Sequence, residues 1–291
     1  MRNIARNQLF SLLHVDYVKL GSKWNYKTVV SPYYRLYYID DGHGKITSTQ
    51  GSIDLEAGFL YLIPSFTVCD LNCEQYLSQY FVQFFEELGS GLSLFFNQRK
   101  VLKVKAHEID IVNFKRLIAI NPGRGINRSD NPEVYEKDIY YKEYQELNLQ
   151  QSLSCQFETQ GILFQLMARF LAEENFSPQV ESLIPSKIMD SINYIQLNMS
   201  EKLSVKMLAL RVNMHVDYFS RLFLQTMGVR PMAYILDKRI ERAQYLMITR
   251  DMTLEEIATQ TGFENVPYFS KVFKSITGIT PGKYKNRQRN V

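Results

Sequence analysis

The sequence predicts an α+β protein. A small β barrel or sandwich with flanking helices comes first, followed by an all-α domain of two helix-turn-helix units joined by a long helix. Three observations support this fold class. Strand-like runs recur over residues 14–86, apolar residues take helical spacing beyond residue 105, and one pattern occurs twice in the last hundred residues. A chain of 291 residues is long enough for two domains.

The N-terminal strands are predicted from residue alternation and from turn residues. Tyr33–Ile39 is rich in residues that favour strands, and the Asp40–Gly44 run after it is a turn signature. An apolar run at 59–63 ends at Pro64, and 79–85 reads as a further strand. Short strands at this spacing imply a small sandwich or barrel.

Helical spacing replaces alternation after the strands. Residues 109–120 carry apolar side chains at helical intervals, and Thr159–Ala172 forms a stronger helix whose apolar residues cover more than one face. Such a broad stripe needs a partner on two sides, the barrel and a second subunit; simple core packing is the alternative. We expect an N-terminal domain over 1–180, with its helices at about 105–176, and a linker at 177–185.

The duplication lies in the C-terminal third. Tyr218–Phe223 reads Tyr-Phe-Ser-Arg-Leu-Phe, and Tyr268–Phe273 reads Tyr-Phe-Ser-Lys-Val-Phe, fifty positions later. A repeat of this size is one supersecondary unit. Each copy is predicted as helix, tight turn and helix, over about 204–226 and 253–276 in a domain at 186–291.

The second copy has the clearer helix ends. Thr253 and Glu256 form a capping box, and Gly262 suits the tight turn. Asn265 can cap the next helix, and Pro267 is tolerated in its first turn because the missing N–H has no partner there. These signals place the start of both helices in this copy.

The charge of the chain is unevenly distributed. Residues 186–291 contain sixteen Lys and Arg against nine Asp and Glu, whereas residues 1–185 contain eighteen against twenty-one. A basic domain attached to a mildly acidic one suggests that the C-terminal part binds a polyanion. On charge alone, an ordinary solvated surface is an equal interpretation, and the duplicated unit favours DNA.

A helix-turn-helix places its second helix in the major groove, with exposed residues at base edges. Burial of Phe219 and Phe223 directs Arg221 outward, where a guanidinium can bind guanine bidentately. Two units on a rigid connecting helix would reach successive major-groove segments on one face of the DNA. The predicted DNA-contacting residues are Asp217, Ser220, Arg221, Val266, Pro267, Ser270, Lys271 and Lys274.

Further basic residues are predicted to bind phosphate. Lys274, Lys283, Lys285 and Arg287 would add affinity without sequence information. The alternative for each basic residue is a solvated surface charge. For Asp217, a capping or first-turn contact is favoured over base reading.

A multi-residue signature in the last third carries a family resemblance. Its segments are Arg242-Ala243, Leu246, Ile257-Ala258, Gly262-Phe263, Tyr268-Phe269-Ser270, Phe273-Lys274 and Gly278–Lys285. By these residues, 186–291 resembles the AraC/XylS family of bacterial transcription regulators. The family usually has Arg where Lys285 stands and often Lys where Leu224 stands. The resemblance implies transcriptional control through double-stranded operator or promoter DNA, with RNA polymerase as a further candidate partner.

Residues 14–86 more loosely resemble the cupin-like sensor barrel of the same family, through residues 34–39 and 60–64. This resemblance implies a small-molecule effector, often a carbohydrate, in the barrel. It also implies a homodimer through the N-terminal domain helices, with about 159–172 as the dimer helix. Trp24, Arg35 and Tyr37 are the candidate effector-binding residues, because aromatic rings and a buried cation suit a sugar or a carboxylate; a core role is the alternative.

An enzyme is not expected. Metal-dependent cupin enzymes need clustered ligands around an open position, whereas His14, His43, His107 and His215 include no close pair. We therefore predict no catalytic residues, no metal and no cofactor. Two rival interpretations remain: a cupin enzyme fused to a DNA-binding domain, and an effector-independent DNA-binding protein whose barrel only dimerises.

The three cysteines make a secreted disulfide framework improbable. Cys69 and Cys73 are interpreted as small buried hydrophobes, with a redox or alkyl-accepting pair as the alternative. No stretch has the roughly 18 apolar residues of a membrane span, and the apolar run at Leu9–Leu13 is too short for a signal peptide. We expect a cytoplasmic protein without a membrane partner.

Overall fold

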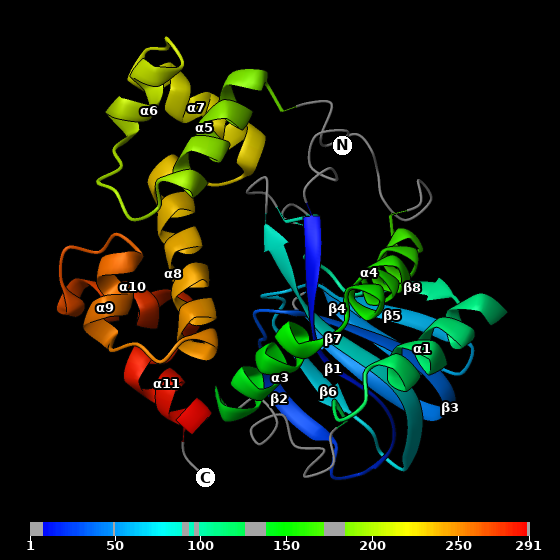
Figure 1. Cartoon of the computed structure of the whole chain (residues 1–291). Helices are drawn as coiled ribbons and strands as arrows, with labels where there is room; N and C mark the ends of the chain where they lie inside the picture. Colours follow the sequence, from blue (N-terminus) through cyan, green and yellow to red (C-terminus); the bar gives the residue numbers. More distant parts are fainter. Residues whose placement is uncertain are drawn as a thin grey trace. The chain divides into compact units, whose positions relative to one another are not determined.

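The computed structural model describes residues 8–48, 50–88, 93–95, 99–125, 138–171 and 184–289. It confirms the predicted α+β class, with an antiparallel sheet domain followed by a helical region (Figure 1). The chain forms two compact units. The barrel unit consists of residues 8–87 and 98–177, and the helical unit consists mainly of residues 178–291. Residues 177–183 of the predicted linker lie outside the described ranges.

The barrel unit is built on antiparallel strands with helices on one side. Its strands are β1 (Gln8–Gly21), β2 (Asn25–Val29), β3 (Tyr34–Ser48), β4 (Gly51–Glu56), β5 (Phe59–Ile63), β6 (Cys69–Asn72), β7 (Tyr76–Leu88) and β8 (Leu102–Lys105). Its helices are α1 (Glu108–Ile120), α3 (Asp138–Gln150) and α4 (Leu153–Ala168). Helix α4 begins earlier than the predicted Thr159 because Ser152 caps it, accepting a hydrogen bond from the Cys155 N–H at 3.2 Å.

The long strand β3 connects two parts of the sheet. Its first half pairs with β5 and β7, and its second half pairs with β4 and β6. The predicted turn at Asp40–Gly44 is wrong, since the strand continues through it with a bulge between Ile39 and Asp41. Gly42 has φ +81°, and a Cβ there would lie 2.3 Å from the Tyr76 carbonyl oxygen. Glycine therefore lets the strand bend where the sequence indicated a turn.

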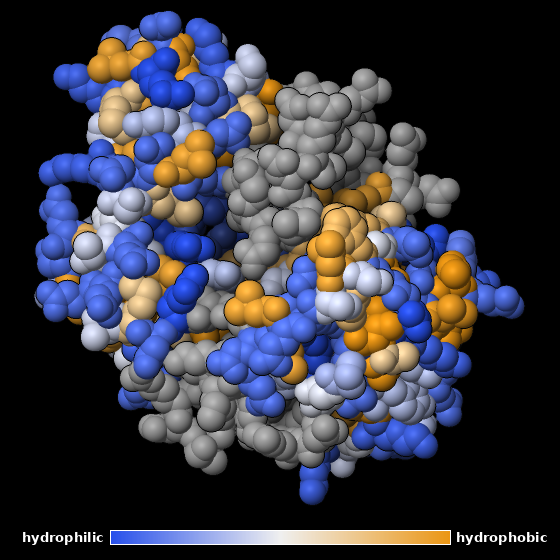
Figure 2. Space-filling view, viewed as in Figure 1, coloured by the Kyte–Doolittle hydropathy of each residue, from blue (hydrophilic) through white to orange (hydrophobic). Residues whose placement is uncertain are grey.

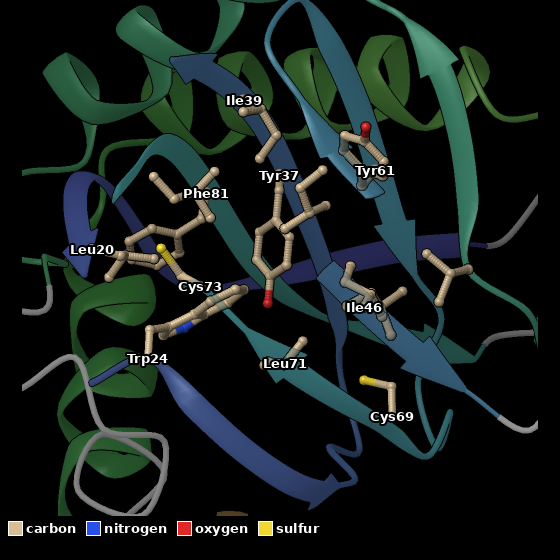
Figure 3. Packing of buried hydrophobic residues seen from close by; sticks show 14 of the residues in the cluster. Leu20, Trp24, Tyr37, Ile39, Ile46, Tyr61, Cys69, Leu71, Cys73 and Phe81 are labelled. Atoms are coloured by element: carbon tan, nitrogen blue, oxygen red, sulfur yellow. The ribbon is translucent and has the colours of Figure 1, made fainter. Parts of the chain in front are cut away.

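Alternate residues of β3 face opposite sides. Tyr37 and Ile39 belong to a cluster of buried residues inside the barrel, the interior cluster (Figure 3). Between them, the Tyr38 ring faces the helices and lies 6.4 Å from the ring of Phe114 in α1. This period of two places one set of β3 side chains in the interior and the other under the helices.

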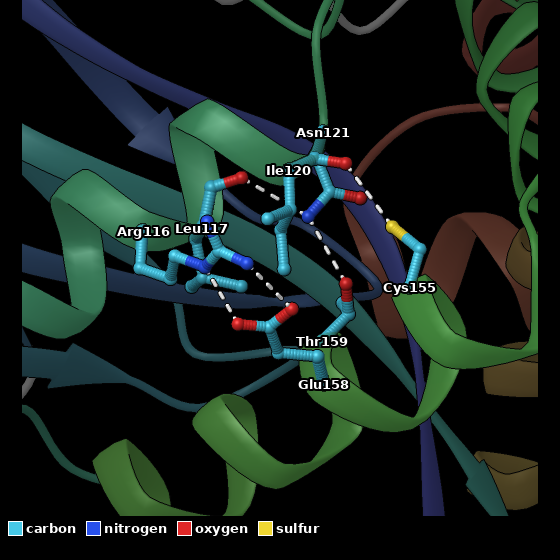
Figure 4. Close-up of polar contacts among 7 residues, drawn as sticks. All are labelled: Arg116, Leu117, Ile120, Asn121, Cys155, Glu158 and Thr159. Carbon is cyan, nitrogen blue, oxygen red and sulfur yellow. Dashed lines mark hydrogen bonds and ion pairs between the residues drawn. The ribbon is translucent and has the colours of Figure 1, made fainter.

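Helices α1 and α4 are held together by polar contacts (Figure 4). Arg116 pairs with both carboxylate oxygens of Glu158, at 2.6 and 2.9 Å. The Asn121 side-chain amide donates to the Thr159 hydroxyl at 3.0 Å, and the Cys155 thiol donates to the Ile120 carbonyl oxygen at 3.1 Å. The first half of α4 is thus fixed against α1 within one protomer.

The helical unit repeats one aromatic core. Its helices are α5 (Ser186–Leu197), α6 (Val205–Arg211), α7 (Val216–Met227), α8 (Pro231–Thr249), α9 (Leu254–Gln260), α10 (Val266–Thr277) and α11 (Pro281–Arg289). In the first copy, Phe223 of α7 contacts the rings of Phe219 and Tyr234 at 5.7 and 5.5 Å. The residues fifty positions later make the same contacts at 5.6 and 5.4 Å. The duplicated sequence therefore folds into duplicated packing.

Candidate nucleic-acid interface and ligand cavity

Helix α7 separates an apolar face from an exposed polar one. Phe219 and Phe223 are fully buried, whereas Asp217 and Arg221 are exposed and Ser220 is half-buried. Arg221 forms no ion pair with any residue that the structure describes. Its guanidinium is therefore available to an outside ligand, as the helical pattern predicted.

Helix α10 presents the matching face in the second copy. Pro267, Lys271 and Lys274 are exposed, and Val266 and Ser270 are half-buried. Ser270 and Lys271 stand at the positions of Ser220 and Arg221 in the repeat. Both copies thus place a half-buried serine before an exposed cation. Ile276, in the last turn of α10, is 43% exposed.

Asp217 makes a local contact at the start of α7. Its carboxylate lies 3.7 Å from His215 Nδ1, and both side chains are exposed. An acidic residue in the first helical turn interacts favourably with the helix dipole. This geometry fits the first-turn role that was favoured for Asp217 over base reading.

The predicted phosphate contacts differ in their exposure. Lys283 is exposed, but Lys285 is buried and its ammonium group donates to the Met252 carbonyl oxygen. The prediction for Lys285 is therefore wrong, because the side chain turns inward to satisfy the loop before α9. The side chain of Arg287 lies outside the described residues.

Arg239 of α8 connects the two copies. Its guanidinium donates to the carbonyl oxygens of Met199, Glu201 and Gly262, at 3.0, 2.6 and 2.7 Å. Met199 and Glu201 precede the first copy, and Gly262 is the turn of the second. Burial lowers the pKa of the Arg239 guanidinium from its ordinary value. Sequence reasoning assigned no role to Arg239.

The length of the connecting helix α8 can be compared with the spacing of major-groove segments on DNA. It has 19 residues, and at 1.5 Å per residue it is about 28 Å long. Successive major-groove segments on one face of a duplex are about 34 Å apart. The connecting helix is therefore of the same order of length as the spacing between two such segments.

The barrel unit contains a cavity of about 350 Å³, within the size range of small-molecule sites. Trp24 and Tyr37, both predicted effector residues, line it. Figure 3 shows the Tyr37 hydroxyl pointing toward the part of the interior where Trp24 lies. Arg35 is not among the lining residues, and its Nη2 donates to the Cys69 sulfur at 3.4 Å. The structure thus groups two of the three candidates.

Two further cavity residues were missed by sequence reasoning. Gln79 and Gln83 of β7 line the cavity and are 3% and 1% exposed. In the sequence, the two glutamines alternate with apolar residues, which is the pattern of a strand whose polar side faces solvent. Their pairing opposite Ile39 and Arg35 of β3 is the feature that turns them inward.

The cysteines pack in the barrel interior. Cys69 and Cys73 are free thiols and are each 1% exposed within the interior cluster. Burial raises the pKa of the Cys73 thiol, which disfavours the reactive thiolate. This environment fits the interpretation of small buried hydrophobes.

Helix α4, the predicted dimer helix, uses its apolar stripe within the protomer. Ile162, Leu163 and Leu166 are all buried. The exposed apolar residues of this helix are Leu153, Phe157 and Phe164, which are 69%, 72% and 41% exposed. Figure 2 shows hydrophobic residues on the surface over the helices of the barrel unit.

The described ranges contain no group of three or more His, Cys, Asp or Glu side chains that could hold a metal ion. Within the same ranges, every helix is too short or too polar to cross a membrane.

A family model described as a helix-turn-helix domain matches residues 208–287. The chain is 35% identical over 124 residues to the "Uncharacterized HTH-type transcriptional regulator YisR" of Bacillus subtilis, a match that covers 43% of this chain and 42% of the relative. It is 30% identical over 129 residues to the "Arabinose operon regulatory protein" of Salmonella typhimurium, covering 43% and 44%. The chain thus spans less than half the length of these two relatives.

A solved structure matches the whole fold. This is the unsaturated fatty acid bound ToxT of Vibrio cholerae, with a TM-score of 0.52, 16% identity, and coverage of 100% of this chain and 99% of that one. At this identity the match shows a common two-domain fold. Together with the duplicated helix-turn-helix, these comparisons show that residues 208–287 form a helix-turn-helix domain similar to those of the named transcription regulators, in agreement with the AraC/XylS resemblance of the sequence.

Proposed function

We propose that this protein binds specific double-stranded DNA at an operator or promoter, and that a small molecule in the barrel cavity controls this binding. The observation that carries the proposal is the matched pair of exposed faces on α7 and α10. Arg221 and Lys271 occupy equivalent positions there and are exposed. Each can reach base edges when its helix enters the major groove.

The remaining DNA contacts follow the same geometry. Ser220 and Ser270 lie beside the two cations, and Val266 and Pro267 lie in the first turn of α10, the end of a reading helix that meets bases. Lys274 is exposed toward the end of α10 and is assigned to phosphate. RNA polymerase remains a candidate partner of the DNA-bound protein.

The DNA assignment is tested by selecting binding sites from random DNA with the full-length protein. Fluorescence anisotropy then measures the affinity for a selected site and for a scrambled one. We expect at least a thousandfold preference for the selected site, the lower end for specific DNA-binding proteins. Equal affinity for both sequences at every salt concentration would contradict the proposal.

The effector assignment is supported by the cavity and by two comparisons. One relative is named for an arabinose operon, and the ToxT structure contains a fatty acid. In this chain, Trp24 and Tyr37 line the cavity, and Arg35 lies in the same barrel interior. A ligand changes DNA affinity only if it interacts differently with the free and DNA-competent states. DNA binding that no ligand alters would favour the rival, a barrel that only dimerises.

We further propose that the chain forms a homodimer through α4 and the helices around it. Because Ile162 and its neighbours are buried within the protomer, the contact would use the exposed Leu153 and Phe157, one helical turn apart. Sedimentation velocity tests this with Phe157→Glu, and the exposed Leu197→Glu of α5 is the control. A dimer that persists in Phe157→Glu, or a monomeric wild type, would contradict it.

A further inference from the structure

Two glutamines form the polar side of the cavity in the barrel unit. Gln79 and Gln83 lie on the same face of β7, with Phe81 between them, and all three line the cavity. Both side chains are at least 97% buried. The surrounding interior cluster is otherwise apolar and includes Trp24 and Leu20.

Neither glutamine amide oxygen has a hydrogen-bond partner among the described residues. An acceptor that is buried without a partner destabilises the folded protein. An apolar side chain of similar volume would fill the same space without this cost. Two such oxygens on one face of one strand, both beside a cavity, indicate groups kept for a ligand.

Gln160 of α4 shows how this chain uses a glutamine for structure. Its amide oxygen accepts a hydrogen bond from the Phe10 N–H at 3.0 Å, and its amide nitrogen donates to the Phe10 carbonyl oxygen. Both ends of that amide are therefore paired with the backbone of β1. Gln79 and Gln83 lack this kind of pairing at their oxygens.

We propose that Gln79 and Gln83 bind an uncharged, hydroxyl-rich ring, and so select the class of effector. This inference rests on the proposed effector site in the same cavity. A carboxamide accepts a hydrogen bond from one hydroxyl and donates to a neighbouring one, so each can bind adjacent hydroxyls of a ring. The Trp24 and Phe81 rings supply apolar surface for the face of that ring.

The charges at the cavity fit a neutral ligand. Asp16 and Lys19 both line it and carry opposite charges. Lys19 is exposed, whereas the buried polar groups of the lining, Gln79 and Gln83, are neutral. A fatty acid would place a carboxylate or a long apolar chain against these amides, and either arrangement leaves an amide oxygen unpaired. The two unpaired amide oxygens therefore favour a ligand with hydroxyl donors over the carboxylate of a fatty acid.

The test compares Gln79→Leu and Gln83→Leu with Gln160→Leu in the full-length protein. Without ligand, we expect each cavity variant to melt roughly 2–4 °C higher than wild type, because a buried unpaired oxygen is removed. Gln160→Leu should melt lower, because two hydrogen bonds to β1 are lost. This opposite sign separates a ligand-binding role from a structural one.

Isothermal titration then uses a panel of neutral aldopentoses, aldohexoses and their methyl glycosides, with palmitoleate as the fatty acid. We expect one or more sugars to bind wild type and Gln160→Leu, and to bind both cavity variants at least tenfold more weakly. Lower melting temperatures for both cavity variants overturn the proposal, as does a wild type that binds palmitoleate or no sugar. Neither assay contains DNA, so failure here is distinct from failure of DNA binding.

Discussion

The two helix-turn-helix copies share a core but differ at their ends. The same aromatic contacts recur in both, within a few tenths of an ångström. The tight turn uses Asn213 with φ +52° in the first copy and Gly262 with φ +78° in the second. Left-handed backbone is unstrained for glycine and less favourable for asparagine. The two copies therefore share the same core packing, although the residue at their tight turn differs.

Capping shows the same difference. In the second copy, Asn265 caps α10 by accepting a hydrogen bond from the Tyr268 N–H at 2.8 Å, and α9 begins with a complete capping box at Thr253. In the first copy, the N-cap residue of α7, His215, makes no side-chain capping hydrogen bond, and Ser204 alone caps α6. We infer that the second copy has the more firmly fixed reading helix and that the first opens locally more often.

The largest expected effect comes from the residue that joins the copies. Arg239→Met should lower the free energy of unfolding of the helical unit by about 3 kcal/mol, because three carbonyl oxygens lose the hydrogen bonds that the buried Arg239 guanidinium donates. Urea unfolding followed by circular dichroism measures this. The control is Arg242→Met, an exposed site on the same helix, where about 0.5 kcal/mol or less is expected. Equal losses in the two variants would show that Arg239 does not join the copies.

The two reading helices should differ in what they read. Arg221→Ala should weaken specific binding by about 1–3 kcal/mol and relax the preference at one base pair, because a bidentate guanine contact is lost. Lys271→Ala removes a single point charge and should cost less. Anisotropy titrations against single-base variants of a selected site measure both. If Arg221→Ala weakened binding equally to every DNA sequence, Arg221 would contact a phosphate and not a base.

The difference in capping can be reversed by mutation. His215→Asn should add an N-cap to α7 and stabilise it by about 1 kcal/mol, whereas Asn265→Ala should cost α10 about the same. Amide hydrogen exchange in the first turn of each helix reports these changes locally. Suppose that Asn265→Ala lowers the exchange protection of α10 but His215→Asn leaves that of α7 unchanged. The missing cap would then not be the cause of local opening in α7.

The smallest expected effect is a pH dependence confined to the second copy. Hydrogen bonds from Thr253 hold the pKa of Glu256 below its ordinary value of 4.5. A lowered carboxyl pKa in the folded state stabilises the fold above the unfolded pKa, and this is lost as the pH falls through the folded value. The protection factors at the start of α9, which correct for the intrinsic exchange rate at each pH, should therefore fall in acid, and Glu256→Gln should abolish this fall. Helix α6, capped by Ser204, should show no matching acid effect.

Much of this molecule follows from local sequence patterns. Capping residues predicted the helix starts of the second copy, the repeat and its buried phenylalanines predicted the exposed face of α7, and strand-favouring residues predicted the strand at 33–39. Local sequence patterns gave wrong predictions where a contact with a residue distant in the sequence determines the conformation. Gly42 reads as a turn because its close approach to Tyr76 is not local, and Lys285 reads as a surface cation because its acceptor lies 33 positions away.

The cavity was predicted only in part for the same reason. Aromatic residues such as Trp24 and Tyr37 are recognisable candidates for a ligand site in any barrel sequence. Gln79 and Gln83 alternate with apolar residues, which is also the pattern of a strand with one solvated face. Only the pairing of β7 with β3, and the β1 residues that complete the cavity lining, turn these amides into interior groups.

The central claim is that both copies read one face of a duplex at the same time. Site selection from random DNA, followed by hydroxyl-radical footprinting with the full-length protein, tests it most directly. The account predicts two recognition elements centred about 10–10.5 base pairs apart, protected on the same face. A single element, or two elements half a helical turn apart on opposite faces, would contradict it.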